Sequence, residues 1–151
     1  VQGQEELKLY RDRYKGYLDA LKKNNLAYDE KLVWHGIENA NVVVSRELTR
    51  VLNEGIEFDA ILCSSDNLAV ATVHTLSQLG KTVPGDVAII GYDNVPISEL
   101  LVPRLTAISQ PFKEMGRKAV NVLVDMIEGK LNDNEKSYIF DPTLIERDTV
   151  I

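Results

Sequence analysis

The sequence predicts an α/β protein built on a mainly parallel sheet that is flanked by helices. Short apolar runs alternate with segments of helical spacing through most of the 151 residues. The clearest unit spans residues 59–93, where two apolar runs flank a helical segment. Two buried strands joined by a crossover helix run parallel. Polar residues follow both strands, and ligands of open parallel sheets bind beyond the carboxyl ends of the strands, so we expect a site there.

Three elements are expected before this unit. Residues 7–23 place leucines and tyrosines at helical spacing, which predicts an amphipathic helix. A short apolar run predicts a strand over residues 31–35. Residues 41–53 favour a helix that ends before Gly55, although the valines at 42–44 would also suit a strand.

The central unit divides into a strand over residues 60–63, a helix over 67–80 and a second strand over 87–92. Gly80 is placed to end the helix, and the Pro-Gly pair at 84–85 is placed to turn the chain back. We therefore expect a tight crossover between the two strands.

A loop, a strand over residues 105–108 and a helix opened by Pro111 are expected next. This helix has the clearest amphipathic pattern in the chain and should end at Gly129. Its apolar face consists of Phe112, Met115, Ala119, Val120, Leu123 and Ile127. After a polar loop, short strands are predicted over 137–140 and 144–145.

Composition limits the function. The formal net charge is -6 and the pI is near 4.9, which argues against a nucleic-acid-binding surface because phosphate neutralisation needs clustered Lys and Arg. No apolar span is long enough to cross a bilayer, and no signal peptide is evident. A single cysteine, Cys63, fits a reducing compartment. Because the chain begins at Val1 without a methionine, we expect it to be a piece of a longer protein.

Two short motifs suggest enzymatic sites but fail on inspection. Residues 80–82 read Gly-Lys-Thr, yet a phosphate-binding loop needs a second glycine where this chain has Thr75, and it opens a helix rather than closing one. The polar run 64–66 lacks the flanking glycines of a hydrolase nucleophile turn. We favour helix capping by Ser65 or Asp66 instead.

Other chemistry-bearing residues are isolated. His35 and His74 have no partners at metal-ligand spacing, and Cys63 ends an apolar run, which is typical of a small buried hydrophobe. No metal, cofactor or catalytic set is therefore expected. Asp93 must emerge at a strand end, and its position alone leaves open whether it binds ligand or caps a loop.

A set of motifs resembles the regulatory domain of the LacI/GalR family of bacterial repressors. The motifs, in chain order, are RYKGYLDAL at 13–21, SDNLA at 65–69, VPGDVAIIGYDN at 83–94, PRLTAI at 103–108, QP at 110–111, MG at 115–116 and the segment 142–148. Their number and order, more than any one of them, carry the resemblance, and they cover nearly the whole chain.

The resemblance implies a two-lobed fold of the periplasmic-binding-protein-like type I, hinged around a small effector such as a sugar or a nucleoside. Residues 1–110 should form the C-terminal effector-binding lobe. Residues 111–141 should cross to the N-terminal lobe, and 142–151 should return. In the family a helix-turn-helix headpiece and most of the first lobe precede these residues, so DNA contact is expected only through that headpiece, in a cytoplasmic homodimer without membrane association.

The resemblance also implies effector contacts. The family's effector arginine falls on Arg13, whose planar guanidinium suits bidentate bonding to vicinal hydroxyls or a carboxylate. The family's ligand aspartate falls on Asp93. Gln110 matches a polar contact position, and Phe112 offers an apolar wall.

Three further positions are candidates with less support. The family's Asn-Asp pair reads Ser65-Asp66 here, which removes an amide, and Asp66 could either cap its helix or touch ligand. The family often carries an aromatic platform in the loop after its second strand. No aromatic residue occurs at 37–39, so only Asn39 is nominated there.

Three functions compete at this level. The effector-sensing domain of a LacI-type repressor agrees best with the motifs. A periplasmic-type sugar-binding protein, or a sensor domain fused to a signalling enzyme, would share the fold and much of the pocket. An α/β enzyme is disfavoured because no nucleophile, base or metal set is found.

The apolar face of the helix after Pro111 would pack on the other lobe in the family. Left bare it would form a large exposed apolar patch, which usually drives association. We expect this helix either to fold onto its own sheet or to be buried in a dimer.

Overall fold

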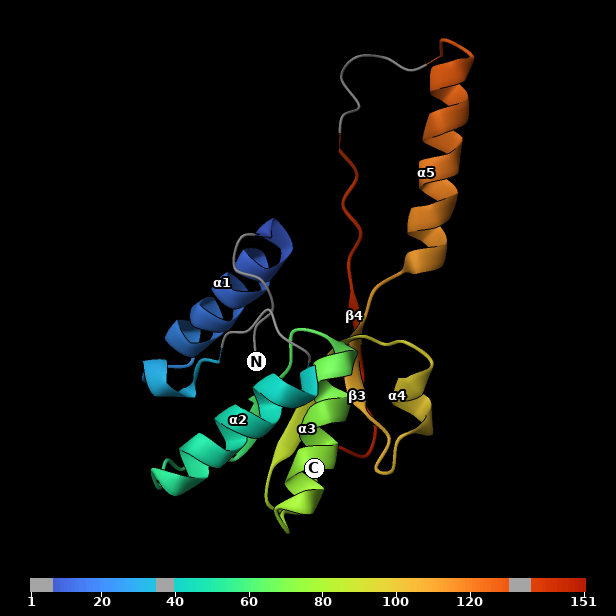
Figure 1. The fold of residues 1–151 in the computed structure, drawn as a ribbon. Coiled ribbons are helices and arrows are strands. Elements are labelled where there is room, and N and C mark those ends of the chain that lie inside the picture. The colour runs from blue at the N-terminus through green and yellow to red at the C-terminus, as the bar shows by residue number, and fades with distance from the viewer. Residues whose placement is uncertain (1–6, 35–39, 131–136) are drawn as a thin grey trace.

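The computed structural model describes residues 7–34, 40–130 and 137–151, which form a four-stranded sheet with helices around it (Figure 1). In chain order the elements are α1 (Lys8–Lys23), the 3-10 turn η1 (Glu30–Leu32), α2 (Ala40–Asn53), β1 (Ala60–Leu62), α3 (Asp66–Gln78), β2 (Ala88–Asp93), α4 (Ile97–Leu100), β3 (Thr106–Ser109), α5 (Phe112–Ile127) and β4 (Thr143–Ile145). The sheet order is β1-β2-β3-β4. The first three strands are parallel and β4 is antiparallel to β3, so the predicted α/β class with a mainly parallel sheet is confirmed.

The predicted helices are confirmed, including the helical interpretation of residues 41–53. The backbone at Gly55, Gly80 and Gly129 has positive φ angles of 66°, 73° and 68°. Glycine adopts this left-handed conformation without the penalty of a Cβ atom, and it commonly follows the last turn of a helix. These three glycines therefore end α2, α3 and α5 as the sequence predicted.

Two predicted strands are wrong. Residues 31–34 form the end of η1 and an extended segment without a strand, and His35 lies outside the described residues. Residues 137–140 also form no strand. A strand needs a neighbour to accept its backbone hydrogen bonds, and among the described residues neither segment has one. The short helix α4 was not predicted, because its four residues lie between Pro96 and Pro103 in a stretch that resembles a loop.

The core lies between the sheet and the pair α2 and α3. Fully buried side chains from the helix pair and from the sheet meet there, among them Leu48 of α2, Leu76 of α3, Ile89 of β2 and Leu105 before β3. Burying each such aliphatic side chain contributes about 1.5–3 kcal/mol relative to exposure. This packing fixes the strand ends from which polar side chains emerge.

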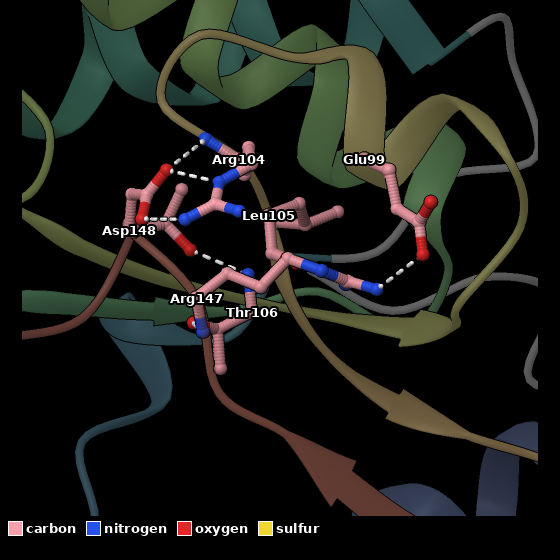
Figure 2. A network of polar contacts seen from close by, with 7 residues as sticks. Glu99, Arg104, Leu105, Thr106, Arg147 and Asp148 are labelled. Carbon is pink, nitrogen blue, oxygen red and sulfur yellow. Dashed lines mark hydrogen bonds and ion pairs between the residues drawn. The ribbon is translucent and has the colours of Figure 1, made fainter.

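The C-terminal residues are tied to the sheet by a polar network (Figure 2). Arg104 donates to Asp148 from Nε at 2.7 Å and from Nη2 at 2.9 Å. Arg147 donates to the Glu99 carboxylate at 3.2 Å and to the Leu105 carbonyl at 2.7 Å. The network therefore holds the end of the chain against α4 and the start of β3.

Helix α5 and residues 137–142, which lead into β4, project together away from the rest of the molecule (Figure 1). None of the α5 residues is buried. Its exposed apolar residues are Phe112, Val120, Leu123, Val124, Met126 and Ile127. The alternative in which α5 folds onto its own sheet is therefore wrong, because the chain after β3 leads the helix beyond the sheet edge.

Candidate functional site

Arg13, Asp93 and Gln110 converge at the carboxyl ends of the parallel strands. Arg13 Nη2 lies 3.5 Å from Asp93 Oδ1, and Gln110 Nε2 donates to the same oxygen at 2.6 Å. The three residues come from α1, from the last position of β2 and from the residue after β3. The register places Asp93 opposite Ser109, which sets Gln110 one residue beyond it. This is the edge at which open parallel sheets bind ligands.

Arg13 is held by several contacts at once. Its Nη1 donates to the carbonyl oxygen of Ser64, two residues after the end of β1. The guanidinium carbon lies 3.6 Å from the centroid of the Tyr92 ring, a cation–π contact that also orients the plane of the fork. The side chain retains 19% exposure, against 26% for that of Asp93. Both charged groups therefore remain accessible to a small polar ligand.

The backbone is strained where Asp93 sits. Asp93 has φ of 106° and Asn94 has φ of 55°, although neither is glycine. Such conformations cost about 1–3 kcal/mol each and persist where surrounding structure determines them, often at functional sites. Asn94 Nδ2 donates to Ser109 Oγ at 3.2 Å, which helps to hold this turn. The turn directs the Asp93 carboxylate toward Arg13 and Gln110.

Ser65 and Asp66 have different roles from each other. Ser65 is the N-cap of α3, with its hydroxyl 3.5 Å from the Leu68 amide nitrogen. Asp66 is only 1% exposed, and its Oδ2 accepts hydrogen bonds of 2.7 Å from the Val95 amide and the Ser98 hydroxyl. Asp66 thus ties the loop after β2 to the start of α3. Because Val95 lies two residues after Asp93, the same bonds help to fix the turn at Asp93.

The other two candidates do not join this cluster of contacts. Phe112 begins α5, is 52% exposed, and is linked to the cluster only through its amide, which donates to the Gln110 carbonyl at 2.9 Å. Asn39 lies outside the described residues. Phe112 can serve as a wall only for a ligand that extends toward α5.

Sequence reasoning missed two supporting residues. Tyr92 carries the cation–π contact to Arg13, and its position next to Asp93 at a strand end was the signal that could have identified it. Ser98 binds Asp66 from a short helix that has no sequence pattern of its own. This contact depends on the path of the loop after β2. The spacing of residues along the chain does not predict that path.

Cys63 is fully buried, and that burial raises the pKa of its thiol, which opposes the reactive thiolate form. No group of three or more His, Cys, Asp or Glu residues that could hold a metal ion is found among residues 7–34, 40–130 and 137–151. No helix there combines the length and the apolar character that a membrane span requires. His74 is exposed on α3.

Fold and site together define a class of protein. The model of the periplasmic binding protein-like domain family matches residues 1–150, and the chain belongs to this family. Within it, the resemblance to LacI/GalR-type transcriptional regulators is confirmed by the relatives that the chain matches, which are regulators of this type.

Two of these relatives and one solved structure illustrate the likeness. The transcriptional regulator GalR of Salmonella typhimurium (strain SL1344) is 34% identical over 139 residues, covering 92% of this chain and 40% of GalR. CelR of Thermobifida fusca is 36% identical over 124 residues, covering 81% of this chain and 36% of CelR. The complex of the regulator CelR with cellobiose matches with a TM-score of 0.88 at 29% identity, over 99% of this chain and 45% of that one. The chain thus spans about 40% of the length of GalR.

Proposed function

We propose that this chain is the ligand-sensing part of a bacterial LacI-type repressor and that it binds a small sugar or a similar polyhydroxylated metabolite. The observation that carries the proposal is the meeting of Arg13, Asp93 and Gln110 at one strand edge. These groups offer a planar set of donors, an anionic acceptor and an amide, which together suit vicinal hydroxyl groups.

The spacing of the charged pair fits this role. At 3.5 Å, the contact between Arg13 and Asp93 is longer than an ordinary charged hydrogen bond. A ligand hydroxyl can bridge the two groups by accepting from the guanidinium and donating to the carboxylate. Within the part of the chain that the structure describes, the hydrogen bonds to the Asp93 carboxylate involve only Oδ1, so Oδ2 is available as a second acceptor.

The division of the chain is part of the proposal. Residues 1–110 and 142–151 form the effector-binding lobe, and 111–141 cross to a second lobe. The exposed face of α5 and its projection away from the sheet support this division (Figure 1). The ties between residues 147–148 and the start of β3 support placing the C-terminal segment with the first lobe.

The remaining partners follow from the relatives. The proteins that the chain matches are transcriptional regulators, and CelR is solved with cellobiose. We infer that the whole protein is a cytoplasmic homodimer that acts on DNA through a headpiece outside this chain, and that it is not an enzyme. Effector binding between the lobes would favour one lobe arrangement and so change operator affinity. A periplasmic-type binding protein is not favoured, because these relatives are regulators.

The test uses the full-length protein. Thermal unfolding is measured against a panel of mono- and disaccharides and nucleosides, and each stabilising compound is then assayed for its effect on operator binding. A sugar that raises the unfolding midpoint and also changes operator affinity supports the proposal. Stabilisation without any change in operator affinity would point to a binding protein instead.

A further inference from the structure

Gln110 joins the effector cluster to the corner of the chain at which α5 begins. Its side-chain Nε2 donates to Asp93 Oδ1 at 2.6 Å, which is short for a bond from nitrogen to a carboxylate. Its own carbonyl oxygen accepts from the Phe112 amide at 2.9 Å, with Pro111 between them. One residue thus contacts the effector cluster through its side chain and the start of α5 through its backbone.

The corner between β3 and α5 is a defined turn. Pro111 has φ of -79° and ψ of 62°, which, with the bond from Phe112 to Gln110, is the geometry of an inverse γ-turn. The proline ring restricts φ, and the Pro111 carbonyl accepts from the Met115 amide at 3.0 Å in the first turn of the helix. Residues 110–112 therefore set the direction in which α5 leaves the sheet, so a movement of Gln110 moves the whole helix.

Few other contacts among the described residues hold α5 in this direction. None of its residues is buried. Lys118 Nζ lies 4.0 Å from the centroid of the Tyr138 ring, which ties the helix to residues 137–142, and these project with it (Figure 1). The projecting unit meets the sheet at the pair Ser109 and Thr143, where β3 ends and β4 begins. Helix α5 has 16 residues and is about 24 Å long, so a rotation of about 10° at the corner displaces its far end by about 4 Å.

Asp93 shares one oxygen between two donors. Its Oδ1 lies 2.6 Å from Gln110 Nε2 and 3.5 Å from Arg13 Nη2. The carboxylate is therefore bound closely to the corner of the chain and loosely to α1. A ligand hydroxyl that bridges Arg13 and Asp93 adds a third partner on the side of Arg13, and this draws the carboxylate away from Gln110. Ligand binding at the cluster thus acts on the same bond that positions the corner.

We propose that the bond between Gln110 and Asp93 directs α5, and that effector binding redirects α5 by weakening this bond. Gln110 is then a positioning residue, because it fixes the angle between α5 and the sheet even when no ligand is bound. The inference rests on the proposed function, in which the ligand is a small polyhydroxylated molecule and α5 belongs to the second lobe. A change in the direction of α5 is therefore a change in the arrangement of the lobes.

Distances between spin labels test the first half of the proposal without any ligand. In the full-length protein, labels are attached at Ser77→Cys on α3 and Asn121→Cys on α5, both exposed positions, and other accessible cysteines are replaced by serine. Cys63 is fully buried and is kept. Labelled protein is diluted into an excess of unlabelled protein, so that the measured distances arise within one chain. Gln110→Met keeps the approximate shape of glutamine but donates no hydrogen bond, so the ratio of the parent distance to other distances should fall by about tenfold or more.

An exchange of the two polar groups separates this bond from a general effect of substitution. Gln110→Glu places two carboxylates against each other and should shift the distance further than Gln110→Met does. Adding Asp93→Asn to Gln110→Glu restores a donor and an acceptor in reversed order, so the double variant should return to the parent distance. Lys113→Met, at an exposed position in the first turn of α5, is the matched control and should leave the distance unchanged. Parent distances in both Gln110→Met and Gln110→Glu would overturn the proposal.

The second half is tested with the sugar that most stabilises the full-length parent in the panel of mono- and disaccharides. At saturation this sugar should shift the parent's label distance in the same direction as Gln110→Met does, and it should change operator affinity about fivefold more in the parent than in Gln110→Met. A variant that binds the sugar more weakly but shows the parent's full operator response at saturation would make Gln110 a ligand contact only, and the proposal would be wrong. If no sugar changes operator affinity in the parent, the proposed function fails, while the label distances without ligand still decide whether Gln110 directs α5.

Discussion

The Arg13 guanidinium and the Asp93 carboxylate lie 3.5 Å apart although 80 residues separate them in the chain. One belongs to the first helix and the other ends a central strand, so only the fold brings them together. Gln110, the residue after β3, donates from Nε2 to the same Asp93 oxygen at 2.6 Å. The three polar groups form a cluster at the carboxyl edge of the sheet, with a backbone turn of positive φ holding the carboxylate in place.

Replacing Arg13 should abolish the effector response in the full-length protein without unfolding the domain. Hydrogen bonds to charged groups contribute about 1.5–3 kcal/mol, so Arg13→Ala should weaken effector binding by about ten- to hundredfold. Arg13→Lys should recover little, because a lysine keeps the charge but loses the planar fork. Calorimetry and operator-binding assays measure the effect. Arg11→Ala, an exposed arginine of the same helix, is the matched control.

Asp93→Ala provides the complementary test of the same cluster. It removes the acceptor shared by Arg13 and Gln110. We expect loss of the effector response with little loss of fold. Circular dichroism should therefore remain that of the parent. A normal response from this variant would show that the site assignment is wrong.

The isolated 151-residue chain should bind its effector weakly. In the proposed arrangement a second lobe supplies about half of the contacts with the effector and the closing motion. Without that lobe, the free energy of the remaining contacts offsets little more than the entropic cost of association. Calorimetry with the effector found for the full-length protein should therefore give a dissociation constant in the millimolar range or no measurable heat. Micromolar binding by this chain would contradict the two-lobed arrangement.

Gly91→Ala should destabilise the domain through Asp66. A Cβ atom at Gly91 would lie 2.4 Å from Asp66 Oδ1 and 2.7 Å from Leu105 Cδ2. Asp66 is buried and bonded to Val95 and Ser98, so relief requires moving that network or the core, at a cost of about 1–3 kcal/mol. Chemical denaturation measures the loss. Gly16→Ala is the control, because its Cβ would meet nothing within 4 Å and should stabilise α1.

The Arg104–Asp148 pair should contribute a small stability that disappears in acid. Hydrogen bonding from Arg104 lowers the pKa of Asp148 below its ordinary value. The contribution is therefore present above the pKa of an unfolded aspartate, which is about 4, and is lost as the pH falls through the lower folded value.

Unfolding of the parent and of Asp148→Asn, measured against pH, tests this. The difference between the two proteins should shrink as the pH falls below about 4. In an Arg104→Gln background, Asp148→Asn should have a smaller effect, because the side chain that contributes most to lowering the Asp148 pKa is gone. A pH-independent difference would show that the pair does not act through the charge of Asp148.

The apolar face of α5 should drive self-association of the isolated chain. Leu123 is 56% exposed and Ile127 is 77% exposed, and both lie on a helix with no buried residue. Exposed apolar patches of this kind usually mark interaction surfaces. Sedimentation should show a dimer for the parent and a monomer for Leu123→Asp. Asn121→Asp adds the same charge to the same helix at an exposed polar position and should remain dimeric.

The parallel sheet and its helices could be predicted because their signals are local. Apolar runs, helical spacing and helix-ending glycines at 55, 80 and 129 are properties of a few neighbouring residues, and each helix they predicted is present. The strands predicted at 31–35 and 137–140 failed for a different reason. Their apolar composition is that of strands, but a strand forms only when another strand accepts its hydrogen bonds.

The sequence alone determined the α/β class, the family and the chemistry of the candidate site, because these depend on residue types and on the order of motifs. Only the tertiary structure decided that Arg13, Asp93 and Gln110 meet around one carboxylate oxygen, that Asp66 is turned inward to Ser98, and that α5 stands away from its own sheet. The physical reason is that local patterns set which elements form, whereas the packing of α2 and α3 on the sheet and the register of its strands set which side chains come into contact.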